Sequence, residues 1–197
     1  MCVTTVGCDS STGPAGGAGS PPAALPSIPA APTTTQPAPS SAGDDKKVDY
    51  SRLLLEPADL SDNEDTFVEQ SSTPSGPDGL PGASALFVNQ DDTRAISDTI
   101  VIYPDAETAA NTLRAALPTI GTTITGATPR PAPVGTDGTL AVGMSKDGSK
   151  AATLLLFTEG NALVRLEFQS APGDVTTDDF VINIGKMQQI ALRAGLS

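Results

Sequence analysis

The stretch TLAVGMSKDGSKAATLLLFTEGNALVRLEFQS, residues 139–170, predicts three consecutive antiparallel strands. The first spans residues 139–144, and the KDGS that follows is a hairpin turn because Asp-Gly tolerates the positive φ that such turns require. Residues 151–158 are apolar throughout, as in a central strand. After a second turn, residues 162–170 alternate between apolar and polar side chains, which is typical of a strand with one buried face.

Two strands and a helix are predicted on the N-terminal side of this stretch. Residues 83–89 are predicted to form one strand, and residues 97–103, which contain a β-branched run, are predicted to form another. Asp105 then fits the N-cap of a helix, which Pro118 is expected to end. Alanines and leucines fall on one face of this helix at helical spacing: Ala106, Ala109, Ala110, Leu113, Ala116 and Leu117.

A second helix is predicted over residues 177–194. Thr176 and Asp179 have the spacing of a capping box, and Gly195 is expected to supply a left-handed C-cap. The expected core stripe is apolar at helical spacing: Phe180, Ile184, Met187 and Ala191.

The segment before these elements is harder to read. The three leucines at 53–55 predict a short helix or first strand that Pro57 stops. Residues 61–82 are rich in proline and glycine, so we expect no regular structure there. The predicted fold is α+β: an antiparallel, twisted sheet of about five strands, in the order β-β-α-β-β-β-α, with both helices on one face.

The chain ahead of this domain has a different composition. Residues 1–45 contain eight prolines, six glycines and three charged residues, which is too little apolar surface to offset the entropy of ordering them. We therefore predict a disordered stalk rich in Pro, Ala, Ser and Thr over residues 9–47 and a single domain over 48–197.

The residues that precede the stalk, Thr5-Val6-Gly7-Cys8, resemble a bacterial lipobox. This resemblance implies that the thiol of Cys8 carries a lipid, such as a diacylglycerol with a palmitate chain, and that residues 1–8 are the remnant of a signal peptide. It also predicts an extracytoplasmic domain anchored to the cell membrane. The alternative is a chance Gly-Cys pair in a cytosolic protein with a low-complexity tail.

Composition excludes several kinds of chemistry. The 197 residues include no histidine, and both cysteines, Cys2 and Cys8, precede the stalk. The domain therefore lacks the ligands of a conventional zinc site and the residues of serine–histidine or cysteine–histidine catalysis. From Val48 onward there are 20 acidic and 9 basic residues, which disfavours nucleic-acid binding. We expect a monomer that is not an enzyme and has no cofactor and no metal.

Acidic residues cluster at three places. The densest group, Asp59 to Asp65, suggests calcium, but the EF-hand spacing is missing and a solvated loop is the better interpretation. Asp91-Asp92 and Asp178-Asp179 could serve as paired carboxylates of a hydrolase. A polar turn and a helix N-terminus explain them equally well.

An apolar ligand could lie between the sheet and the first long helix, whose alanines leave space there. The same side chains would also fill an ordinary core, which is the more frequent outcome. The residues that would line such a site are Leu113, Ala109, Ala116, Leu154, Leu156, Val164 and Leu166.

Three short motifs carry a resemblance to a known family. LLLEPADL at 53–60, YPDAETA at 103–109 and GKMQQIALRAGL at 185–196 resemble segments of small mycobacterial and related actinobacterial cell-envelope lipoproteins. The domain is similar to the extracellular sensor part of PknH-type kinases and to LpqN-like lipoproteins with a Mog1/PsbP-like α-β fold. It lacks the disulfide-forming cysteines of the kinase sensor.

This resemblance implies a fold and a location, and it supplies no catalytic residues. The chain is therefore expected to be a non-catalytic envelope lipoprotein that binds a partner protein or an apolar or lipid ligand. The alternative is a hydrolase that acts on envelope glycans or lipids through paired carboxylates.

Overall fold

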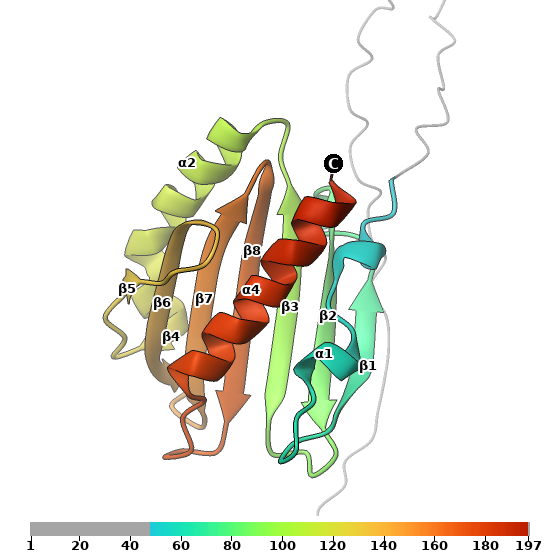
Figure 1. The fold of residues 1–197 in the computed structure, drawn as a ribbon. Helices are drawn as coiled ribbons and strands as arrows, with labels where there is room; N and C mark the ends of the chain where they lie inside the picture. Colours follow the sequence, from blue (N-terminus) through green and yellow to red (C-terminus); the bar gives the residue numbers. More distant parts are fainter. Residues whose placement is uncertain (1–47, 197) are drawn as a thin grey trace, which may run out of the picture. The chain divides into compact units, whose positions relative to one another are not determined.

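The computed structural model describes residues 48–196, which form an α+β domain built on one antiparallel sheet (Figure 1). The strand order across the sheet is β1-β2-β3-β8-β7-β6-β4, and β5 also pairs with β6. The eight strands are β1 (Phe67–Thr73), β2 (Gly82–Asn89), β3 (Ala95–Ile102), β4 (Ile124–Thr125), β5 (Arg130–Pro131), β6 (Thr136–Ser145), β7 (Ala151–Glu159) and β8 (Ala162–Ser170).

Two long helices and several short ones complete the domain. The α-helices are α1 (Pro57–Leu60), α2 (Ala106–Ala116), α3 (Ile120–Thr123) and α4 (Asp178–Gly195), and the 3-10 helices are η1 (Ser51–Leu53), η2 (Pro77–Gly79) and η3 (Leu117–Thr119). Within residues 48–196 no helix has the length and apolar character needed to cross a membrane.

The five strands expected from the sequence are confirmed as β2, β3, β6, β7 and β8, but the expected strand number is too low. The structure adds β1, β4 and β5. β1 lies at the edge of the sheet, is exposed from residue 68 onward and contains a bulge between Glu69 and Ser71. An edge strand without a buried face shows no apolar alternation, so the expectation that residues 61–82 lack regular structure is wrong.

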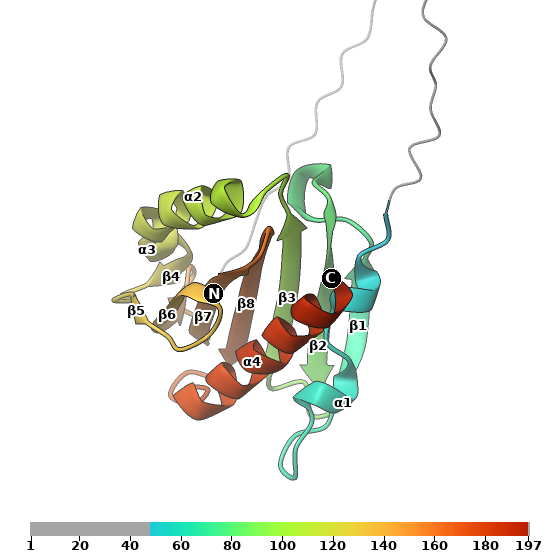
Figure 2. The ribbon, with the colours of Figure 1, turned by 45° about the horizontal axis from the view of Figure 1, so that its top comes forward.

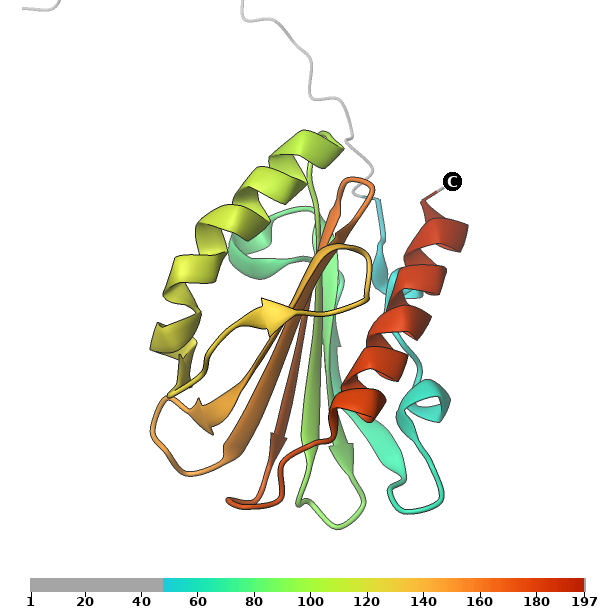
Figure 3. The same ribbon diagram turned by 60° about the vertical axis from the view of Figure 1, so that its left-hand side comes forward.

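The two long helices lie on opposite faces of the sheet, not on one face as expected (Figures 2 and 3). Strand β7 shows this directly. Leu155 and Phe157 join the core beneath α4, whereas Leu154 and Leu156 pack with Leu113 of α2. Since β7 is apolar at nearly every position, both of its faces need cover, and two helices on one face would expose half of the strand.

The helix α4 runs diagonally across its face of the sheet (Figure 2) and is displaced by one residue from the prediction. Its N-cap is Thr177, whose hydroxyl group accepts from the Phe180 amide, so the proposed cap at Thr176 is wrong. The expected core stripe shares only Ile184 with the buried residues, which are Val181, Ile184, Gly185, Gln188 and Leu192.

The Gly195 prediction is also wrong, because this glycine is the last residue of α4 and has no positive φ, and the C-cap is Leu196. A Cβ atom at Gly195 would lie 2.1 Å from Cδ2 of Leu53. The glycine therefore permits close packing of the helix on the N-terminal segment instead of a left-handed turn.

Proline positions depart from expectation in two places. Pro57 begins α1 instead of stopping a helix, because proline is tolerated in the first turn. After Pro118 the chain continues in helical turns through η3 and α3, although α2 itself ends before it. The Asp105 N-cap is confirmed, since its carboxylate accepts from the Thr108 amide at 2.7 Å.

Candidate functional site

A pocket of about 280 Å³ lies where the α1–β1 loop, the start of β3, the end of β8 and the β8–α4 connection meet. Most of its lining residues belong to those four segments, and one is the first aromatic residue of α4. They are Asp62, Glu64, Asp65, Phe67, Arg94, Ala95, Ile96, Phe168, Gln169, Asp174, Val175, Thr176, Thr177 and Phe180.

The floor of the pocket is apolar and comes from four elements. Phe67 of β1, Ile96 of β3 and Phe168 of β8 are all buried. Phe180 of α4 meets Phe168 edge to face, with ring centroids 6.1 Å apart and an interplanar angle of 80°. Such aromatic pairs keep their rings in a defined orientation, so the floor is a packed part of the core and not a mobile loop.

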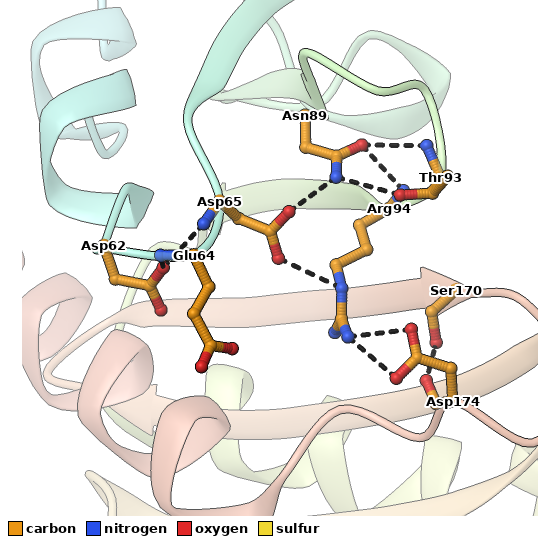
Figure 4. Close-up of polar contacts among 8 residues, drawn as sticks. All are labelled: Asp62, Glu64, Asp65, Asn89, Thr93, Arg94, Ser170 and Asp174. Carbon is orange, nitrogen blue, oxygen red and sulfur yellow. Dashed lines mark hydrogen bonds and ion pairs between the residues drawn. The ribbon is translucent and has the colours of Figure 1, made fainter.

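Arg94, one of the residues that line the pocket, forms a clasp between two segments of the chain (Figure 4). Its Nε forms an ion pair with Oδ2 of Asp65 at 3.0 Å, and its Nη2 donates to both carboxylate oxygens of Asp174 at 2.7 and 2.8 Å. Asp65 precedes β1, whereas Asp174 lies in the β8–α4 connection. The guanidinium group therefore joins two segments that are far apart in the sequence.

The turn between β2 and β3 fixes the position of this clasp. Buried Asn89 donates from Nδ2 to Oδ1 of Asp65 at 2.6 Å, and its Oδ1 accepts from the amides of Thr93 and Arg94. On the other side, the Ser170 hydroxyl group donates to the Asp174 carbonyl oxygen. Because Asn89 and Asp174 are themselves held by hydrogen bonds, Asp65 and Arg94 are held in one geometry.

Asp62 shapes the loop beside the clasp. Its Oδ1 accepts from the amides of Asp65 and Glu64, both at 2.8 Å, and these two bonds lower the pKa of the Asp62 carboxyl group. The Glu64 side chain extends away from Arg94 in Figure 4. Of the described residues that line the pocket, four are carboxylates and one is a guanidinium group, so the rim carries excess negative charge.

The acidic cluster at 59–65 is largely explained by local structure. Asp59 accepts from the Glu56 amide at 2.9 Å as part of the α1 cap, and Asp62 closes its turn as described above. Among residues 48–196 no group of three or more acidic or cysteine side chains is arranged to hold a metal ion.

The two predicted carboxylate pairs lie elsewhere. Asp92 sits in the β2–β3 turn with a φ of 57°, and its amide donates to the Asn89 carbonyl oxygen at 3.0 Å. Asp178 and Asp179 are in the first turn of α4, where Asp178 pairs with Arg130. In the described part of the chain, neither pair contributes to the lining of the pocket.

The seven residues expected to line an apolar site are divided between the two faces of the sheet. Leu113, Leu154 and Leu156 pack together in the core under α2, whereas Val164 and Leu166 belong to the core under α4. Ala109 is buried on α2 and Ala116 is partly exposed. The seven do not line one space, and Cys8, the predicted lipid attachment site, lies outside the described residues.

Sequence reasoning missed Arg94 and Asp174, which form the clasp. Arg94 is the only basic residue between Arg52 and Arg114, in a segment that is otherwise acidic. The isolation of this one basic residue was the feature of the sequence that could have identified Arg94 as a candidate. Its partner could not be found from spacing, because Asp174 lies 80 residues further along the chain.

Comparison with known proteins informs the fold. A scan of protein-family models and a search of curated proteins find no match. Among solved structures, the extracellular domain of PknH from Mycobacterium tuberculosis is similar, with a TM-score of 0.52 and 10% sequence identity over 73% of this chain and 95% of that chain. At this level of identity the likeness concerns the fold alone, and it agrees with the expected resemblance to the sensor part of PknH-type kinases. The domain therefore shares the α+β fold of the PknH extracellular domain.

Proposed function

We propose that this protein is a non-catalytic, lipid-anchored lipoprotein of the bacterial cell envelope whose domain binds a ligand outside the membrane. The lipobox-like TVGC and the proline-rich segment that follows support an anchored, extracytoplasmic arrangement. The fold that the domain shares with an extracellular domain of a kinase is consistent with such a location.

The pocket beside Arg94 is the observation that carries the binding role. It combines a few apolar side chains with a rim that is mainly polar and acidic, so polar and charged contacts would select the ligand. Its volume of about 280 Å³ fits a small molecule or one side chain of a partner. A two-chain lipid is too large to be enclosed in it.

The charges on the rim favour a basic ligand. Arg94 already binds Asp65 and Asp174, whereas no residue among 48–196 forms a hydrogen bond or ion pair with the Glu64 carboxylate or with Oδ2 of Asp62. The partly buried ring of Phe180 adds an aromatic group to the lining, to which a nearby cation is attracted. We therefore propose a ligand with an apolar body and one basic group, such as an alkylamine or the lysine side chain of a partner.

Hydrolysis is the weaker alternative. A general acid needs a carboxyl group that stays protonated near neutral pH, which requires a raised pKa. The pKa of Asp62 is lowered by two amides, and Asp65 and Asp174 are both occupied by Arg94. These features support binding over acid–base chemistry at this pocket.

Calorimetric titration of the full chain with hexylammonium and with hexanoate tests the proposed ligand class. We expect saturable binding of the amine, weaker binding at high salt, and none of the carboxylate. Glu64→Gln should weaken amine binding several-fold, because it removes one rim charge without disturbing the clasp. Glu107→Gln, at an exposed site on α2, is the matched control and should bind like the unmodified chain.

A lysine-containing peptide in the same titration distinguishes a protein partner from a free amine. If neither probe binds, or if hexanoate binds as well as hexylammonium, the proposed ligand class is wrong. Turnover of an envelope glycan or ester that Glu64→Gln abolishes would instead favour the hydrolase.

The lipid anchor is tested separately. Expression of the gene with its native upstream sequence, followed by intact-mass analysis of the membrane fraction, should give a mature chain that begins at Cys8 and carries acyl mass. A different N-terminus, or a Cys8→Ala variant that keeps its acyl mass and membrane association, would contradict the proposal.

A further inference from the structure

A buried carboxyl group lies in the middle of the sheet, away from the pocket. Asp98 of β3 is fully buried and faces the α4 side together with Ile96 and Ile100. Its Oδ2 accepts from the Leu55 amide at 3.3 Å, and its Oδ1 has no hydrogen-bond partner among the described residues. A charged carboxylate in this position would be costly, because one long hydrogen bond cannot replace its water shell.

A second buried polar group holds the same segment of chain. Gln188 of α4 is fully buried, and its Nε2 donates to the Leu53 carbonyl oxygen at 2.7 Å. Its Oε1, like Oδ1 of Asp98, lacks a partner in the described part of the chain. Residues 53–55, here called the strap, are therefore fastened to the sheet by Asp98 and to α4 by Gln188.

Oδ1 of Asp98 and Oε1 of Gln188 are both buried acceptor oxygens without a donor. Protonation of Asp98 would supply one O–H donor at this place. We propose that Asp98 is uncharged while the strap is docked, and that its ionisation loosens the strap and makes this fastening dependent on pH. The strap is the partner that ionisation would release, since the Leu55 amide supplies the only hydrogen bond to this carboxyl group among the described residues.

The electrostatic surroundings support this behaviour. Burial raises the pKa of Asp98 to about 7, and the hydrogen bond from Leu55 opposes that shift only in part. Between the usual value of 3.8 and about 7, the folded domain holds a proton that the unfolded chain releases. The docked strap is therefore fully stabilised at acidic pH and loses stability as the pH rises towards 7.

The charged side chains on the elements that surround Asp98 and the strap form their contacts elsewhere. On β8, Arg165 pairs with Glu167 on the opposite face of the sheet. Arg52, beside the strap, donates to the Gly195 carbonyl oxygen.

The remaining charged residues near Asp98 and the strap are also exposed or engaged with other partners. Glu56 belongs to the α1 cap, Lys186 of α4 is exposed, and Arg193 of α4 pairs with Glu159. In β2, the residue paired with Asp98 is Ala85, which carries no charge. Burial is therefore the main influence on the titration of Asp98.

Two measurements on the full chain test the proposal. Carbon-13 NMR of the side-chain carboxyl groups should show Asp98 titrating near pH 7. Between pH 4 and pH 7, amide hydrogen exchange at Leu55 should accelerate by at least ten-fold more than the ordinary pH dependence of exchange. If Asp98 titrates near pH 4, or if Leu55 is as well protected at pH 7 to 8 as it is at pH 4, the proposal is overturned.

Variants separate this carboxyl group from other acidic residues. Asp98→Asn keeps an acceptor for Leu55 and gains a donor, so Leu55 should stay protected up to pH 8. Asp91→Asn, at an exposed site in the β2–β3 turn, should exchange like the unmodified chain. Gln188→Leu should speed exchange in the strap at every pH. If Asp98→Asn does not fold, the carboxyl titration of the unmodified chain decides the matter.

Discussion

At the scale of single residues, Arg94 determines whether the pocket keeps its shape. Its guanidinium group joins Asp65 to Asp174 and has a side-chain exposure of 27%, so solvent screens these bonds only in part. We expect Arg94→Gln to lower the free energy of unfolding by about 1–2 kcal/mol. Hydrogen exchange should also quicken at residues 62–65 and 171–177, and urea unfolding measures the global effect.

Arg114→Gln is the control for that experiment. Arg114 is 59% exposed and lies 3.8 Å from Asp137, so its loss should change stability by less than about 0.5 kcal/mol. Equal losses in the two variants would show that the clasp is no stronger than an ordinary surface pair.

Asp98 also leads to a prediction for the stability of the whole domain. Because its pKa is raised by burial, the unmodified chain should lose stability between pH 4 and pH 7 at this site, and Asp98→Asn should not. The urea midpoint of Asp98→Asn should therefore exceed that of the unmodified chain at pH 8 and match it at pH 4. The same difference at both pH values would mean that Asp98 acts through packing and not through its charge.

At the scale of elements, α4 lies close to the sheet because it has a glycine where it crosses β7. A Cβ atom at Gly185 would lie 2.5 Å from Cδ2 of Leu155 and 3.1 Å from Cγ1 of Val134. We expect Gly185→Ala to destabilise the domain by about 1–2 kcal/mol, since overpacking outweighs the gain in helix propensity. Thermal unfolding followed by circular dichroism measures the loss.

Gly121→Ala provides the contrast. Gly121 lies in α3 and does not need a positive φ, and a Cβ atom added to it would have no neighbouring atom within 4 Å. The alanine variant should be neutral or more stable by up to about 1 kcal/mol. A stabilising Gly185→Ala would show that α4 can move away from β7 at little cost.

The same elements show how far the sequence could predict the fold. The alternating and apolar runs of β7 and β8 identified both strands, and the Asp105 N-cap placed the start of α2 correctly. β1 was missed because an edge strand with both faces exposed has no apolar period. The faces that α2 and α4 cover follow from β7, whose apolar side chains alternate between the two cores.

The candidate site was less predictable. Asp62, Glu64 and Asp65 stood out as an acidic cluster, yet Asp62 is explained by the turn it closes. The pocket forms where that loop meets Arg94 and Asp174. This arrangement depends on the pairing of β3 with β8. Contacts between residues so far apart in the chain cannot be read from local spacing.

At the scale of the whole molecule, the domain should fold without most of the residues before it. Residues 9–45 have a composition poor in core-forming side chains, so a chain that starts at Asp44 should melt at the same temperature as the longer one. A chain that starts at Glu56 lacks Leu53 and Leu55, which are 1% and 5% exposed, and should lose about 4 kcal/mol or more. A drop of several degrees in the first truncation would show that the N-terminal residues pack on the domain.

The central claim is that this domain binds a small basic ligand in the pocket beside Arg94. The most direct test is a titration of the isotopically labelled full chain with hexylammonium, followed through its backbone amide NMR signals. The account predicts saturating shifts at Arg94, Asp174 and Phe180, and little change at Ala109 and Leu113 of α2. Shifts that gather on α2, or no saturable shifts at all, would contradict it.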